Sequence, residues 1–189
     1  MIDPTVEKTE LTAAEYVALS ARTESVGDEH TNADRLCHSA LGLLTEIAEY
    51  NAAADRANRV EELGDAMWYL AVLVRVQGHD DFSIFGEPPP ADEQSIIAHV
   101  AVVADAAKRW KFYGLEPKWA DVNYAAGYIY HALIFGAFSN NVSAATLWAS
   151  NIHKLRARYP AKFTAEKAAV RDTQQEMTAV LGIINKKEN

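Results

Sequence analysis

Two pairs of acidic residues are spaced so that each pair would lie on one face of a helix. Glu46 and Glu49 are three residues apart, and Glu62 and Asp65 repeat this spacing after twelve intervening residues. Residues three apart are neighbours on a helix surface. If the two helices pack antiparallel, the four carboxylates meet, and their repulsion and desolvation call for a bound cation. Oxygen ligands alone favour Mg²⁺, or Mn²⁺, over Zn²⁺.

The alternative is that these acids lie on solvated helix faces, where such pairs are common. The neighbouring residues favour the metal site. Glu46 is surrounded by apolar residues between positions 43 and 48, and Asp65 directly precedes the apolar run 66–74. Burying an acid without a partner is costly, so the energetics favour a site in which a cation compensates the charge.

The elements that must position these acids are helices. Between the breaks in the chain, apolar residues recur at spacings of four, three and four residues, as on one face of a helix. The strongest break is 82–91, which contains three consecutive prolines at 88–90. We find no period-two alternation, so the sequence predicts a single all-α domain over residues 1–189, a bundle of antiparallel helix pairs. The predicted helices are 13–22, 33–56, 59–77, 92–113, 119–138, 144–158 and 165–184.

Local signals predict several helix ends. Thr12 and Glu15 have the spacing of a capping box, in which each side chain bonds the other residue's backbone N–H. Ser143 and Thr164 are expected to cap the last two helices. Gly78 is expected to end the helix that carries the second acidic pair.

The composition excludes some partners and locations. The 189 residues include 26 acidic and 18 basic ones, a net charge of −8, which argues against duplex DNA or an anionic membrane surface as partner. The longest apolar run, 66–74, is far shorter than the roughly 20 residues of a membrane span. Cys37 is the only cysteine and no signal peptide is visible, so we expect a cytoplasmic protein.

The acidic motif, within "LGLLTEIAEY" and "EELGDAMWYLA", resembles that of the MazG-like nucleoside triphosphate pyrophosphohydrolases. "LTAAEYVALSART" is similar to the first helix of phage-type members, and "NIHKLRARYPAKFT" to their trailing motif. The resemblance implies an all-α enzyme that hydrolyses (d)NTPs to the monophosphate and pyrophosphate with Mg²⁺, clearing or reshaping a nucleotide pool. It also implies a homo-oligomer, most simply a dimer, in the host cytoplasm if the chain is phage-encoded.

The resemblance further implies roles for individual residues. The four acids would hold the metal, and one of the glutamates would take the proton from water. Tyr69 would reach the sugar or the phosphates, and Asn151, Lys154 and Arg158 would contact the polyphosphate. His38 lies on the same helical stripe as the first acidic pair, so it either faces the nucleotide or is a packed structural histidine.

The chain also resembles the same family unit a second time. Residues 33–78 would be the active hairpin, residues 94–138 a degenerate repeat, and 143–189 the C-terminal helices with an N-x-x-K-L-x-x-R-Y-P motif. The repeat could still lend basic and aromatic residues to substrate phosphates; these are Lys108, Arg109, Lys111 and Tyr113. The positions that match the four acids hold no carboxylate; they are His99, Val102, Ala125 and Tyr128. The alternative is that two hairpins of similar composition are alike by accident.

Two other functions remain open at this point. His38, His79, Asp80 and either Asp105 or Asp121 could mimic the ligands of an HD-type metal-dependent nucleotide phosphohydrolase, although this leaves the four helical acids unexplained. The chain could also be a non-catalytic helical binding module with a decayed active site.

Overall fold

The regular structure of this chain is helical. The computed structural model describes residues 8–25, 30–87, 95–161, 163–170 and 172–185, and within these ranges no strand is formed. The predicted all-α class is therefore confirmed. The elements are α1 (Ala13–Ser20), η1 (Ala21–Thr23), α2 (Asn32–Ala52), α3 (Arg56–Val76), η2 (Phe82–Phe85), α4 (Ile96–Tyr113), α5 (Trp119–Ser139), α6 (Ala144–Arg158), α7 (Ala165–Ala169) and α8 (Thr173–Ile184).

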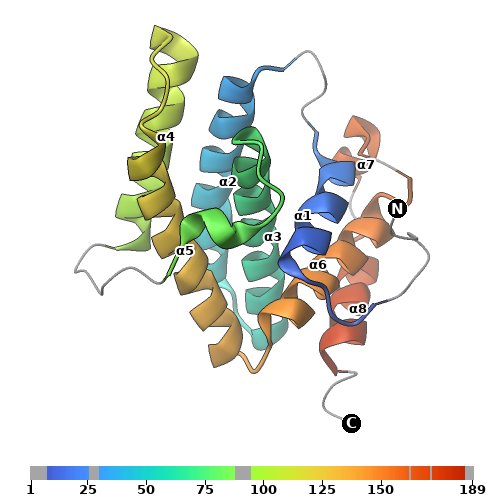
Figure 1. Cartoon of the computed structure of the whole chain (residues 1–189). Helices are drawn as coiled ribbons and strands as arrows, with labels where there is room; N and C mark the ends of the chain where they lie inside the picture. Colours follow the sequence, from blue (N-terminus) through green and yellow to red (C-terminus); the bar gives the residue numbers. More distant parts are fainter. Residues whose placement is uncertain (1–7, 26–29, 88–94, 162, 171, 186–189) are drawn as a thin grey trace.

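Two antiparallel helix pairs form the centre of the molecule. Figure 1 shows α2 and α5 running in one direction and α3 and α4 in the other. Helix α2 packs against α3 and α4, and α5 packs against α4 and α3. Helices α1, α6 and α8 also contact α3. Helix α3 is therefore enclosed by neighbours, which explains why its run Ala66–Val74 is apolar almost all round.

The predicted caps at three helices are confirmed. The Thr12 hydroxyl accepts from the Glu15 N–H while the Glu15 carboxylate accepts from the Thr12 N–H. Ser143 and Thr164 cap α6 and α7 through their hydroxyl oxygens, which accept from the backbone N–H of Thr146 and Lys167. Gly78, just after α3, has a φ of +76°, a conformation that suits glycine.

Four predicted boundaries are wrong, three of them because of the caps Asp55 and Asp172. The fourth is the predicted start at 92, because Ser95 accepts from Ala98 N–H and α4 begins at Ile96. The side chain of Asp55 accepts from Asn58 N–H, so α2 already ends at Ala52 and α3 begins at Arg56. The predicted helix 165–184 is broken into α7 and α8, because Asp172 starts a new helix by accepting from Gln175 N–H. The prolines at 88–90 lie outside the described residues.

None of the helices in the described ranges combines the length and the apolar character that a membrane crossing requires.

Candidate functional site

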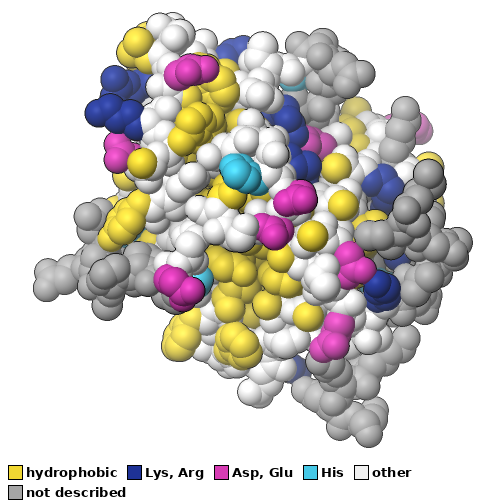
Figure 2. All heavy atoms as spheres, in the orientation of Figure 1, with side chains coloured by type: hydrophobic (Ala, Val, Ile, Leu, Met, Phe, Trp, Pro, Cys, Tyr) yellow, Lys and Arg dark blue, Asp and Glu magenta, His cyan; other side chains and the backbone are white. Residues whose placement is uncertain are grey.

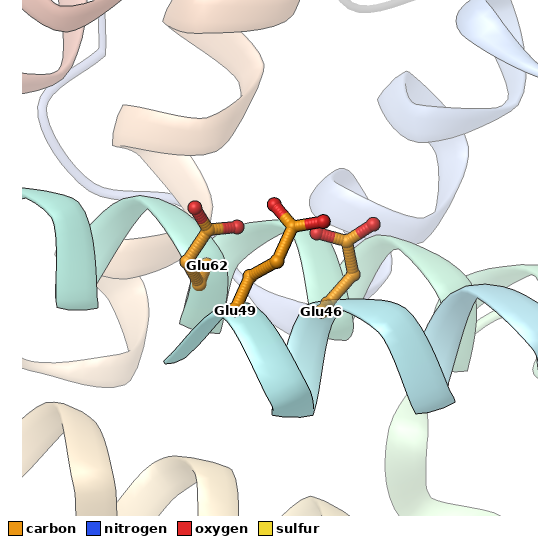
Figure 3. A group of neighbouring side chains, drawn as sticks. All are labelled: Glu46, Glu49 and Glu62. Atoms are coloured by element: carbon orange, nitrogen blue, oxygen red, sulfur yellow. The ribbon is translucent and has the colours of Figure 1, made fainter. Parts of the chain in front are cut away.

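Three of the four predicted acids meet between α2 and α3. One carboxylate oxygen each of Glu46, Glu49 and Glu62 lies within 4.8 Å of the others. Figure 3 shows Glu46 and Glu49 rising from α2 and Glu62 from α3, with their carboxylates on the same side of the two helices. The short antiparallel connection sets this register. Among the described residues, these three form the acidic group that could hold a metal ion.

Asp65 lies beside this group but is bound from the other side. Its Oδ1 accepts a hydrogen bond of 2.7 Å from Asn151 Nδ2, and its Oδ2 accepts one from Lys154 Nζ. Lys154 Nζ also lies 3.2 Å from Glu61 Oε1. Both donors project from α6, so the aspartate links the α2–α3 hairpin to the third helix of the site.

Burial and neighbouring acids raise the pKa values of two glutamates of the cluster. Burial raises the pKa of Glu46 to about 8, and the negative charges of Asp65 and Glu62 and a hydrogen bond with Glu62 act in the same direction. Burial also raises the pKa of Glu62 to about 7, together with the charges of Asp65 and Glu61. The two glutamates therefore share a proton near neutral pH unless a cation is bound.

Lys154 is a fully buried cation, with a side chain 1% exposed. Burial lowers the pKa of its ammonium group, but the charges of Asp65 and Glu61 outweigh this effect, so the pKa lies above its usual value. Lys154 therefore remains charged and compensates two carboxylates of α3.

The glutamates open into a cleft of about 680 Å³, which we call the acidic cleft. Side chains of α2, α3, α6 and α8 line it, together with residues at the end of η1 and just after η1 and α6. Five of the lining residues are acidic and two are Lys or Arg, so the cleft has an excess of negative charge: Glu46, Glu49, Glu61, Glu62 and Asp65, against Lys154 and Arg158.

One wall of the acidic cleft is aromatic. The ring of His38 makes edge contacts with Trp68 and Tyr69, with centroids 5.9 and 5.3 Å away. Burial lowers the pKa of His38, so the imidazole is neutral near pH 7. Burial and the charge of Glu46 raise the pKa of Tyr69 to about 12, so its hydroxyl keeps its proton. Both predicted residues line the cleft, and His38 is packed as well as cleft-lining.

Arg158 reaches the acidic cleft while helices α7 and α8 tether it. Its Nη2 donates to the carbonyl oxygen of Ala168 at 3.0 Å, and its Nε lies 3.7 Å from Glu176 Oε1. Its guanidinium carbon lies 5.1 Å from the centroid of the Tyr159 ring. The C-terminal helices therefore determine where this charge points.

The structure places the predicted α4 residues elsewhere. Lys108 pairs with the exposed Asp105, Arg109 lines a separate pocket of about 260 Å³, and Tyr113 is 65% exposed. Figure 2 shows Lys and Arg side chains gathered on the visible face beside the upper part of α4. None of these three predicted residues lines the acidic cleft.

The reason is the register of two antiparallel helices. Lys111, near the end of α4, pairs with Asp34 at the start of α2. Glu46 lies twelve residues further along α2, which is about 18 Å at 1.5 Å per residue. The basic end of α4 therefore lies near the opposite end of α2 from the carboxylates.

Two positions that the proposed repeat matches to acids lie in contact with each other. In the predicted register, His99 and Tyr128 match Glu46 and Asp65. The rings of His99 and Tyr128 stack with centroids 4.0 Å apart. The duplication stays a prediction.

The residues of the HD-type alternative are not gathered. His79 and Asp80 lie on the exposed turn after α3, and Asp121 lines the smaller pocket with Asp105. Within the described ranges, the group of clustered acids and histidines contains none of them.

Two residues of the site were not predicted. Glu61 pairs with Lys154. It lies four residues before Asp65, and this spacing, which places both acids on one face of α3, could have identified it. Tyr16 donates a hydrogen bond to Asn151, and no sequence signal identifies it, because the contact depends on how α1 packs against α6.

Comparison of the chain with protein-family models, with curated proteins and with solved structures gives no match.

Proposed function

We propose that this protein is a Mg²⁺-dependent nucleoside triphosphate pyrophosphohydrolase. Water would attack the α-phosphorus of a (d)NTP, the bond from that phosphorus to the α,β-bridging oxygen would break, and (d)NMP and pyrophosphate would be released. The observation that carries the proposal is the cluster of Glu46, Glu49 and Glu62 in a cleft large enough for a nucleotide. The resemblance of the two acidic pairs to the MazG-like motif is consistent with it.

A divalent cation fits this donor set. All three clustered residues offer carboxylate oxygens, which suit Mg²⁺ or Mn²⁺, and Lys154 and Arg158 do not balance the five acids of the acidic cleft. Burial and the neighbouring acids raise the pKa of Glu46, so a bound cation would favour its carboxylate form. Bound there, such an ion supplies charge compensation for phosphate oxygens and a more acidic water.

The chain's own residues would perform the remaining tasks. One of the clustered glutamates, as the carboxylate, accepts the proton of the attacking water. Arg158, which α7 and α8 hold in the lining of the acidic cleft, would supply positive charge where negative charge develops on the leaving pyrophosphate. Lys154 is committed to Asp65 and Glu61, so it acts on the polyphosphate less directly than the sequence predicted.

The test is pyrophosphate release from a panel of canonical and modified (d)NTPs with and without Mg²⁺. We expect Mg²⁺-dependent release with at least one nucleotide, and loss of it in Glu49→Gln. Glu87→Gln, which makes the same change at an exposed position outside the acidic cleft, is the matched control and should keep wild-type rates. No release from any member of the panel would refute the proposal.

A further inference from the structure

A chain of hydrogen bonds joins helix α1 to Asp65. The hydroxyl of Tyr16, whose side chain is 0% exposed, donates to Asn151 Oδ1 at 2.9 Å. Asn151 Nδ2 donates to Asp65 Oδ1 at 2.7 Å. Tyr16 lies outside the residues that line the acidic cleft, so its hydroxyl contacts the site through Asn151 and, at 3.2 Å, the Gly64 carbonyl oxygen.

The hydrogen-bond partners of Asn151 determine which way its side-chain amide faces. A carboxylate only accepts hydrogen bonds, so Asn151 must turn its Nδ2 toward Asp65 and its oxygen toward Tyr16. Burial, together with the charge of Asp65, raises the pKa of Tyr16 well above its usual value, so its hydroxyl always has a proton to donate. The hydroxyl is therefore the donor that the amide oxygen needs in a buried place.

The surrounding packing leaves this group little freedom. A Cβ on Gly64 would lie 3.0 Å from Asn151 Cβ, so α6 approaches the α3 backbone closely at this point. The Gly64 carbonyl oxygen also lies 3.2 Å from the Tyr16 hydroxyl. The ring of Trp148 stacks on that of Tyr16, with centroids 6.1 Å apart and an interplanar angle of 20°. Packing thus sets the position of the amide, and the Tyr16 hydroxyl and the Asp65 carboxylate together set its rotation.

We propose that Tyr16 is a positioning residue, which orients Asp65 through Asn151 for the chemistry of the acidic cleft. The inference rests on the proposed function, because it assigns Tyr16 a part in that reaction. Lys154 holds one oxygen of Asp65 and Asn151 the other, so the plane of the carboxylate is fixed from both sides. Without the hydroxyl only Asp65 orients the amide, so the restraint that Asn151 places on this carboxylate is weakened.

The first experiment compares Tyr16→Phe with Tyr130→Phe. Both remove one hydroxyl from a buried or half-buried ring, and Tyr130 packs against Phe82 and Phe85, away from the acidic cleft. For Tyr16→Phe at saturating Mg²⁺ we expect kcat to fall about tenfold, as for partners that orient a site residue, with KM within about twofold. Tyr130→Phe should keep both constants. A wild-type kcat in Tyr16→Phe, or an equal loss in both variants, would overturn the inference.

A second variant tests the route through Asn151. Asn151→Ala should lower kcat at least as much as Tyr16→Phe, and adding Tyr16→Phe to it should cause no further loss. Losses that multiply in the double variant would show that Tyr16 acts by another route and would overturn the inference.

A third measurement needs no activity. In metal-free protein, the side-chain amide NMR signals of Asn151 can be identified by their disappearance in Asn151→Ala. We expect Tyr16→Phe to shift these signals and Tyr130→Phe to leave them in place; unshifted signals in Tyr16→Phe would overturn the inference. If the wild-type chain releases no pyrophosphate, the proposed function fails, and this measurement still decides whether Tyr16 orients Asn151.

Discussion

The ring of Tyr69 on α3 occupies the space that a side chain at Gly42 on α2 would need. A Cβ on Gly42 would lie 2.1 Å from Tyr69 Cζ and 2.2 Å from Cε1, well inside contact distance. Tyr69 lines the acidic cleft and contacts the rings of His38 and Trp68. The absence of a side chain at Gly42 thus determines where this wall of the cleft lies.

Gly42→Ala should therefore alter the site more than the stability. The ring of Tyr69 has to rotate away, and the cost of this displacement is partly offset by the higher helix propensity of alanine, about 1 kcal/mol. We expect a melting temperature within a few degrees of the wild type, a changed Trp68 fluorescence, and pyrophosphate release lowered about tenfold or more. Gly182→Ala on α8, where a Cβ meets nothing within 4 Å, is the control and should leave activity unchanged.

The metal-free protein should lose stability as the pH rises from 5 to 8. Glu46 and Glu62 have folded-state pKa values raised to about 8 and about 7, above their ordinary 4.5, so in this range the folded state binds more protons than the unfolded one. The free energy of unfolding then falls with increasing pH. Urea unfolding at several pH values in EDTA measures this, and a flat or rising curve contradicts it.

Glu46→Gln should remove most of that decline, because a neutral amide replaces the acid that is most difficult to ionise. We expect the metal-free variant to exceed the wild type in stability at pH 8 by on the order of 2 kcal/mol, and by much less at pH 5. Glu87→Gln, at an exposed position, should follow the wild-type curve. The difference between the two variants isolates the contribution of Glu46.

Added Mg²⁺ should reverse the effect. A ligand at 100 times its Kd stabilises the folded state by about 2.7 kcal/mol, and binding to carboxylates that share a proton releases this proton. The increase in melting temperature on adding Mg²⁺ should therefore be larger at pH 8 than at pH 6, and absent in Glu49→Gln. Equal increases in the variant and the wild type would place the ion elsewhere.

Lys154→Met should destabilise the protein strongly. It leaves Asp65 and Glu61 without their buried counter-charge, and breaking a buried pair from one side costs about 3 kcal/mol or more. Lys108→Met breaks a pair with the exposed Asp105 and should leave the melting temperature almost unchanged. Similar melting temperatures for the two variants would show that the buried pair contributes little.

Much of the secondary structure follows from short-range patterns. The apolar spacing along α2 and α3, the Thr12–Glu15 capping box and the N-caps Ser143 and Thr164 involve residues at most a few positions apart. The sequence also determines that Glu46 and Glu49 share a helix face, as does Glu62 with Asp65, because helix geometry alone sets that relation. The caps Asp55 and Asp172 were not predicted, although each bonds a backbone N–H only three residues further along. Sequence patterns are sufficient to predict such caps.

The tertiary structure decided which of these faces meet. Asp65 is held by Asn151, which lies 86 residues away in the chain, and Asn151 in turn by Tyr16, 135 residues away. No periodicity within one helix can specify such contacts, because they depend on how α1 and α6 pack against α3. The same packing places Arg158 in the acidic cleft and leaves Lys108 outside it. The sequence alone therefore determined the residue types and the helix faces of the site, and the packing between helices decided how they come together.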